Sequence, residues 1–248
     1  MKRLENRVII EYLIRSESPV YIREKTDDRD VGLVRDDDMN HIIPGTTIKG
    51  FLRWEMESLL KSAGIYVCKE SKRCHSKPCL LCSIFGNKSI PSRIRVENAC
   101  SDTKRSIKKT GSLIERNRRR TVSSYEIELA PPGIQYSGRI ILENTELKGV
   151  RYASLGAILF MMDYVNATKA AIGGGKTRGM GICKFTPMKI TEYTPEDYIH
   201  NRSGRILYIG DDNESQEKIF SEAMKEYIDG WRGILKGSIK SDIGENDE

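Results

Sequence analysis

The sequence predicts an α+β fold with an antiparallel sheet, and three observations support this. Segments rich in β-branched and aromatic residues alternate with segments whose apolar residues recur at helical spacing. Their order along the chain is strand, helix, strand, strand, helix, strand, with a further helix at the end. At 248 residues, with 38% hydrophobic and 31% charged residues, the chain can bury one core beneath a highly charged surface.

Four segments are expected to be strands. Residues 7–14 read Arg-Val-Ile-Ile-Glu-Tyr-Leu-Ile, which is typical of a buried strand. Residues 93–98 alternate between charged and apolar side chains, which is typical of a strand with one buried face. Residues 134–143 and 182–191 are the other two expected strands.

The first helix is expected after the Pro44-Gly45 turn. Thr46 or Thr47 can cap it, because a hydroxyl oxygen can accept a hydrogen bond from an amide of the first turn. Apolar residues then keep helical spacing through Ser62. The basic residues of this helix fall off the apolar stripe and can face solvent or a ligand: Lys49, Arg53 and Lys61.

A second helix is expected over residues 150–163 and a C-terminal helix over residues 220–235, followed by a polar, frayed end at 237–248. Without the C-terminal helix, the order is β-α-β-β-α-β. This order matches the ferredoxin-like arrangement, in which two helices cover one face of an antiparallel sheet.

Residues 171–181 read Ala-Ile-Gly-Gly-Gly-Lys-Thr-Arg-Gly-Met-Gly. Glycine permits positive φ, so three successive amides of this run can point at an anion, and Lys176 and Arg178 add charge. Such a loop would hold a phosphodiester backbone without reading its bases. The alternative is a glycine-rich turn before a strand. A Walker-type nucleotide-binding loop is excluded, because Ala170 stands where that motif needs its first glycine.

Positive charge is concentrated between Thr103 and Arg120. This segment contains eight Lys and Arg residues and one acidic residue, Glu115, so its formal net charge is +7. The formal net charge of the whole chain is +6. Such a segment is typical of a localised contact with a polyanion, and the alternative is a solvated basic loop. Residues 103–133 are too long and too charged for an ordinary turn, so we expect an excursion from the main domain.

Five potential metal ligands fall within fifteen residues: Cys68, Cys74, His75, Cys79 and Cys82. The Cys79-x-x-Cys82 spacing is that of a zinc knuckle, and Cys68 and Cys74 would complete a structural zinc site. His75 is the alternative fourth ligand, and reduced cysteines without a metal are the alternative to a zinc site. Cys100 and Cys183 lie outside the cluster and are expected to be small core residues.

Catalytic candidates are few. The chain has three histidines, and none has an obvious nucleophile beside it. Six aspartates lie between residues 27 and 38, inside a polar loop spanning 16–40 with a short extended piece at 31–35. A loop carboxylate can bind Mg²⁺ or accept a proton from a ribose hydroxyl, and the alternative is a solvated acidic loop.

No run reaches the ~18 apolar residues of a membrane span, and the charged start carries no signal-peptide pattern. We therefore expect a cytoplasmic protein without a membrane partner.

Three motifs in order resemble the RAMP superfamily of CRISPR-associated proteins. Residues 43–50 read Ile-Pro-Gly-Thr-Thr-Ile-Lys-Gly, with Arg53 following. Residues 82–86 read Cys-Ser-Ile-Phe-Gly and precede Ser-Arg-Ile-Arg-Val-Glu-Asn-Ala at 92–99, and the glycine-rich stretch is the third motif. The resemblance runs from Val8 to Thr191 and is strongest to the repeating backbone subunit of type III (Csm-type) effector complexes.

The resemblance implies one RAMP domain over residues 1–248, with an RRM-like palm, a zinc-bearing insertion at 64–86 and a thumb-like β-hairpin at 103–133. Copies of the chain would form a helical filament along guide RNA, together with other type III subunits. Each thumb would kink the duplex between guide and target RNA. The residues that would hold guide phosphates are Thr46, Thr47, Lys49, Arg53, Gly173, Gly174, Gly175, Lys176 and Arg178.

An aspartate in an early loop of the family cuts target RNA, with Mg²⁺ or Mn²⁺. Asp30 matches it, because it precedes a short extended stretch, then Asp36, then the Pro-Gly motif. Asp27 and Asp28 are the neighbouring alternatives. Three other functions remain: an RNA scaffold without cleavage, a RAMP protein that processes repeat RNA with a histidine, and a zinc-containing nucleic-acid-binding regulator.

Overall fold

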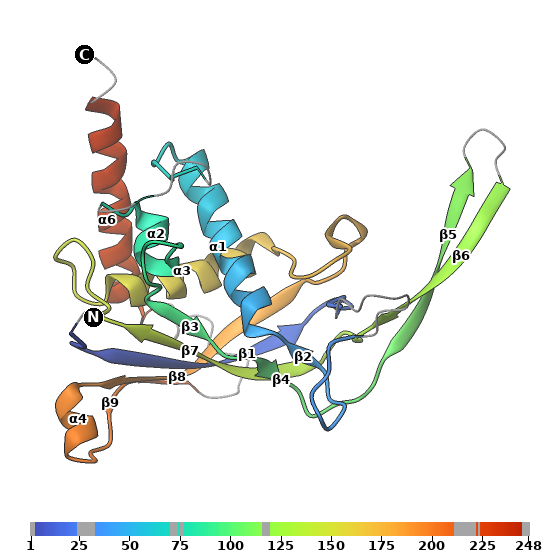
Figure 1. Cartoon of the computed structure of the whole chain (residues 1–248), viewed down its shortest axis with the longest axis horizontal. Helices are drawn as coiled ribbons and strands as arrows, with labels where there is room; N and C mark the ends of the chain where they lie inside the picture. The colour runs from blue at the N-terminus through green and yellow to red at the C-terminus, as the bar shows by residue number, and fades with distance from the viewer. Residues whose placement is uncertain are drawn as a thin grey trace.

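A seven-stranded antiparallel sheet lies at the centre of the structure, and the longer helices all lie on one of its faces (Figure 1). The computed structural model describes residues 3–23, 33–69, 74, 77–115, 120–210, 222 and 224–244. The strands follow the order β2-β4-β7-β1-β8-β9, with β3 also paired to β7. Their bounds are β1 Arg7–Ser16, β2 Ile42–Ile43, β3 Ile94–Val96, β4 Ala99–Cys100, β7 Gln135–Glu143, β8 Cys183–Tyr193 and β9 Arg205–Ile209.

The four expected strands are β1, β3, β7 and β8. They lie in the order β3-β7-β1-β8, and every pair is antiparallel. This order arises when the connection from β1 to β3 and the connection from β7 to β8 both cross the same face of the sheet. The expected α+β class is confirmed, and the sheet is consistent with a ferredoxin-like arrangement.

The core lies between the sheet and the helices. In β1, alternate residues face it, and Val8, Ile10 and Ile14 are fully buried. The register places Ile10 opposite Ile140 of β7 and Ile190 of β8, so three β-branched side chains meet at the centre.

Helix α1, Gly45–Ser62, forms where its apolar spacing predicts. Helix α3, Ala153–Thr168, contacts both β8 and helix α6, so it is buried on nearly every side. Gly156 permits this close packing, because a Cβ there would lie 1.9 Å from the carbonyl oxygen of Tyr227. Two short helices complete the fold: α2, Leu80–Phe85, and α4, Pro195–Ile199.

The C-terminal helix is longer than expected. Helix α6 spans Lys225–Gly244, so the expectation of a frayed segment is wrong for residues 237–244. The apolar stripe of Ile228, Trp231 and Ile234 continues into Ser238, which is buried and accepts a hydrogen bond from Lys148. Tertiary contacts of this kind stabilise a helix beyond what its local composition predicts.

A separate two-stranded sheet projects away from the helices (Figure 1). It consists of β5, Ile107–Glu115, and β6, Arg120–Leu129. The excursion expected at 103–133 is therefore a β-hairpin. Cys183 is buried as expected, but Cys100 of β4 is exposed, so its assignment to the core is wrong. Among the described residues, no helix is both long and apolar enough to span a bilayer.

Candidate nucleic-acid interface and metal centre

The first turn of α1 presents two threonines at the positive end of the helix. Thr46 is exposed and Thr47 is half-buried. The expectation that one of them caps the helix is wrong, because the N-cap is Pro44 and makes no side-chain bond. The helix begins earlier because Gly45 packs against β3: its amide donates to Asn98 Oδ1 at 2.9 Å, and a Cβ there would lie 2.2 Å from the Val96 carbonyl oxygen.

Lys49 and Arg53 make intramolecular hydrogen bonds. Lys49 Nζ donates to Ser92 Oγ at 2.8 Å and to the Ile94 carbonyl at 3.0 Å. Arg53 donates to the Gly86 carbonyl at 2.7 Å. Partial burial lowers the pKa of Lys49, and the charge of Arg53 acts in the same direction. Both cations thus anchor the segment between α2 and β3, which is a structural role alongside the predicted RNA contact.

The glycine-rich loop is folded onto the segment that follows β1. Gly181 donates to the Pro19 carbonyl and Gly174 to the Tyr21 carbonyl, each at 2.8 Å. Gly173 has φ +85°, and a Cβ there would lie 2.6 Å from the Tyr21 carbonyl oxygen. The prediction of three successive anion-binding amides is therefore wrong, because the middle amide is already paired within the chain.

Lys176 connects this loop to α1. It begins the 3₁₀ turn η1, Lys176–Arg178, and its Nζ lies 5.0 Å from the ring centre of Trp54 and 5.5 Å from that of Phe51. Glu55 of α1 is buried nearby; burial raises the pKa of its carboxyl group, and the charge of Lys176 opposes that shift. Two motifs more than a hundred residues apart thus form one surface.

The catalytic candidates Asp30, Asp27 and Asp28 lie outside the described residues, and so does His75. The two ends of the aspartate loop are described. Arg23 and Leu33 pair as an isolated bridge, and the preceding Tyr21 contacts the glycine-rich loop. The root of the loop is therefore next to the glycine-rich surface.

The C-terminal end of the aspartate loop, at Leu33 and Arg35, contacts the β5–β6 hairpin. Arg35 forms an ion pair with Glu128 of β6 at 2.7 Å, and the Leu33 amide donates to the same carboxylate at 3.4 Å. A hydrogen bond from Ser106 lowers the pKa of Glu128, and Arg35 contributes to the shift. Farther along, Asp36 accepts a hydrogen bond from the Asn40 amide at 2.7 Å, so this carboxylate shapes a turn.

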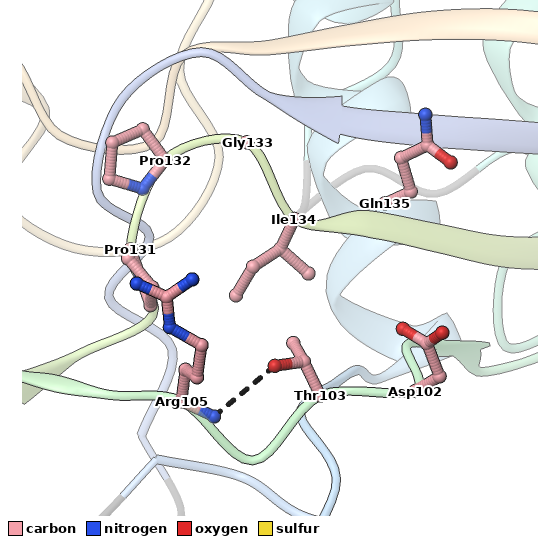
Figure 2. Close-up of a pocket in the computed structure, with 8 residues that line it drawn as sticks. All are labelled: Asp102, Thr103, Arg105, Pro131, Pro132, Gly133, Ile134 and Gln135. Atoms are coloured by element: carbon pink, nitrogen blue, oxygen red, sulfur yellow. Dashed lines mark hydrogen bonds between the residues drawn. The ribbon is translucent and has the colours of Figure 1, made fainter.

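A cavity of about 260 Å³ lies where the hairpin leaves the sheet (Figure 2). Its walls come from the two connections to the hairpin, residues 102–105 and 131–135. Asp102 and Arg105 give it charged groups, while Pro131, Pro132 and Ile134 give it an apolar wall (Figure 2). Sequence reasoning missed this cavity, because its two walls are far apart in the chain.

His41 lies at the same junction and is 1% exposed. Its Nε2 lies 2.5 Å from the Arg105 carbonyl oxygen, so this nitrogen carries the proton. Its Nδ1 is buried with no hydrogen-bond partner among the residues that the structure describes. Burial lowers the pKa of His41, and the nearby charge of Arg35 contributes.

This environment predicts a loss of stability in acid. The pKa of His41 is lower in the folded state than the ~6.5 of an unfolded histidine, so the unfolded chain binds the proton more readily. The contribution is fully present above about pH 6.5 and is lost as the pH falls below it. His41→Gln keeps a donor for the Arg105 carbonyl but cannot titrate. Urea unfolding at several pH values should give a flatter profile for the variant, and parallel profiles would contradict the prediction.

The four cysteines come together as their spacing predicts. The sulfurs of Cys68, Cys74, Cys79 and Cys82 all lie within 4.8 Å of one another, and Cys68 and Cys82 are 3.4 Å apart. A tetrahedral zinc with bonds of ~2.3 Å needs its sulfurs ~3.8 Å apart, so the set fits this ion. Four protein ligands would leave no open position, so a zinc ion held here would be structural.

The surroundings of the cysteine sulfurs are compatible with a bound zinc ion. Burial raises the pKa of the Cys82 thiol to about 12, and the hydrogen bond with Cys68 adds to the shift. A zinc ion would supply the charge that deprotonates such thiols. Asn87 donates to the Cys74 carbonyl at 3.1 Å and to the Cys82 sulfur at 3.5 Å, so it would orient two of the ligands.

A family model described as the RAMP superfamily matches residues 13–184. This range holds 172 of the 248 residues and includes α1, the cysteine cluster, the hairpin and the glycine-rich loop. No curated protein matches the sequence. Because the family model covers more than half of the chain, the protein belongs to the RAMP superfamily, whose members have CRISPR-associated RNA-binding roles.

Proposed function

We propose that this chain is a guide-RNA-binding backbone subunit of a type III (Csm-type) CRISPR effector complex. In this proposal residues 1–248 form one RAMP domain, copies stack into a helical filament along guide RNA, and the filament binds complementary target RNA beside other type III subunits. The observation that carries it is the surface where helix α1, the glycine-rich loop and the root of the aspartate loop meet.

Charge on this surface suits a phosphate backbone. Lys176 and Arg178 lie on η1, and Thr46 and Thr47 present hydroxyls at the positive end of α1. We propose that the RNA strand passes between them, with Lys49 and Arg53 at its edge and with the half-buried backbone of Gly173, Gly174 and Gly175 close to its phosphates.

The β5–β6 hairpin fits the proposed thumb. Lys104, Arg105, Lys108 and Lys109 are exposed at or near its base. Lys108 pairs with Glu126 at 3.3 Å on the surface, where such a pair is worth at most ~1 kcal/mol and can be exchanged for a phosphate contact. The hairpin could therefore reach a duplex of guide and target RNA.

We propose that Asp30 cleaves target RNA. A ribose 2′-hydroxyl would attack the adjacent phosphate while Asp30 accepts its proton, and the 5′-oxygen would leave with a proton from solvent. The products would be a 2′,3′-cyclic phosphate and a 5′-hydroxyl. Mg²⁺ or Mn²⁺ would offset the negative charge of the transition state. A scaffold without cleavage is the competing proposal, since the residues proposed to hold guide RNA do not include Asp30.

RNA recovered with the protein from its native host tests the binding role. A filament subunit should carry RNA of defined length that shares a repeat-derived segment. A zinc-containing regulator outside such a complex should carry none, and that result would contradict the proposal.

Binding to unstructured RNA should fall steeply with salt, at ~0.7 log unit of affinity per phosphate contact for each log unit of salt. Lys176→Ala and Arg178→Ala should each reduce the affinity about fivefold for all sequences and reduce the salt slope by one contact. Lys225→Ala, an exposed change on α6, is the matched control. Fluorescence anisotropy measures these affinities, and a variant that loses affinity for one sequence only would contradict phosphate contact.

A further inference from the structure

Trp54 lies on the proposed RNA surface, and its side chain is unusually exposed for a tryptophan, at 59%. The other tryptophan of the chain, Trp231, is 1% exposed and packs in the core. An indole ring of this size is mostly buried in folded proteins. Nothing in the fold of α1 requires such a ring at an outward position, since the helix is anchored by Ile48, Leu52 and Met56.

The ring of Trp54 is held beside a phosphate-binding candidate. Lys176 Nζ lies 5.0 Å from its ring centre, within the range of a cation–π interaction. This contact orients the indole at the border between α1 and the glycine-rich loop. A strand whose phosphate is held by Lys176 would have its neighbouring base within reach of the ring.

The surface of α1 next to Trp54 carries no side chain at Gly50. Gly50 lies one turn earlier on the same side, is exposed, and has no atom within 4 Å of the position that a Cβ would occupy. A glycine inside a helix costs roughly 0.5–1 kcal/mol relative to alanine, and no contact within the described residues explains it here. Together with Thr46 one turn before it, Gly50 leaves an unobstructed strip that leads to the ring.

We propose that Trp54 is a stacking platform for one base of the bound RNA strand. The proposal rests on the RNA-binding role proposed above and adds a base contact to the phosphate contacts. The occupant is single-stranded RNA, because the ring is bordered by Lys176, and the 3₁₀ turn that carries Lys176 also carries Arg178; these two cations complement a polyanion. Every base has a π face, so this contact tolerates any guide sequence.

The fluorescence of Trp54 itself reports the contact. In a Trp231→Phe background, Trp54 is the sole tryptophan. The RNA-free chain is titrated at low salt with a short single-stranded RNA and with an abasic ribose-phosphate oligomer of the same length. RNA should quench the emission, and the abasic oligomer should bind with little quenching.

Affinity variants complete the test. Base–aromatic stacking is worth ~1–3 kcal/mol, so Trp54→Ala should weaken RNA binding roughly 5- to 150-fold without changing the salt slope. Trp54→Phe should retain most of the affinity, and Trp54→Ala should barely affect the abasic oligomer. RNA that binds by anisotropy with unchanged Trp54 emission, or equally to Trp54→Ala, would overturn the inference while sparing the proposed function. Quenching by a partner subunit but not by RNA would also overturn it, and failure of the unmodified chain to bind RNA would overturn both.

Discussion

Asp30→Ala is expected to abolish cleavage of a target RNA matched to the guide, while guide binding and target binding remain intact. Positioned general bases contribute about 10²–10⁴-fold to a rate, so loss of the proton acceptor should bring cleavage near background. Binding should not suffer, because a carboxylate contributes nothing favourable to holding a polyanion. The root of its loop, at Arg23 and Leu33, is joined to the glycine-rich surface through Tyr21 and to the hairpin through Arg35.

The measurement uses assembled complexes with labelled target RNA. Asp30→Asn keeps the side-chain shape without a titratable carboxylate and should be as inactive as Asp30→Ala. Asp37→Asn, an exposed change outside the loop root, is the matched control and should cut normally. Wild-type cutting by the Asp30→Ala complex would refute the assignment. Loss of cutting in Asp27→Ala or Asp28→Ala instead would keep the nuclease proposal with another residue.

The requirement for a divalent ion is best tested by omitting Mg²⁺ and Mn²⁺ from the buffer. EDTA is a poor choice, because it would also compete for a zinc ion held by the four cysteines. Omission should stop cleavage without releasing target RNA. A wild-type complex that never cuts a matched target in either ion would establish the scaffold proposal.

Replacing both Cys79 and Cys82 with serine is expected to remove the zinc and to lower the stability of the whole fold. Cys79 is the N-cap of α2 and Cys82 lies within the helix. The α2 residues Leu81 and Ile84 are buried in the same continuous core as α1. Loss of the metal would therefore loosen α2 and one side of α1. With several kcal/mol lost, the melting temperature should fall by roughly 10 °C.

Elemental analysis and thermal unfolding measure the two effects. Freshly purified wild-type protein should hold about one zinc per chain, and the double variant less than about a tenth of that. Cys100→Ser is the matched control, because it removes an exposed thiol outside the cluster. Wild-type protein without zinc, or a double variant that melts like Cys100→Ser, would contradict the metal centre. A single variant, His75→Ala, that retains zinc would exclude histidine as the fourth ligand.

Local sequence patterns predicted several elements well. Strand β1 and helix α1 form where alternation and helical spacing place them, because a period of two or of 3.6 residues reflects which side chains face the core. The cysteine cluster was predictable for a related reason: its four ligands lie within fifteen residues, so a short chain can bring them together. The hairpin was expected as an excursion from its charge and length.

Other elements depended on contacts that have no local pattern. Helix α6 runs beyond residue 235, where distant segments contact it, as Lys148 does when it donates to Ser238. The extension could not be read from residues 237–244 alone, since their composition is polar. Strands β2 and β4 are only two residues long, too short for a periodic signal; β4 forms on the edge of β7, and β2 pairs with β4.

The sequence alone determined the order of the main strands and helices, the cluster of four cysteines and the motifs that place the chain in its superfamily. The tertiary structure decided which groups of those motifs are available to a ligand. The Gly174 amide is paired with Tyr21, and Lys49 and Arg53 donate to main-chain carbonyls. Lys176 instead lies over Trp54. These pairings join segments far apart in the chain, and a hydrogen-bond partner supplied from a distance leaves no trace in the spacing of residues along one segment.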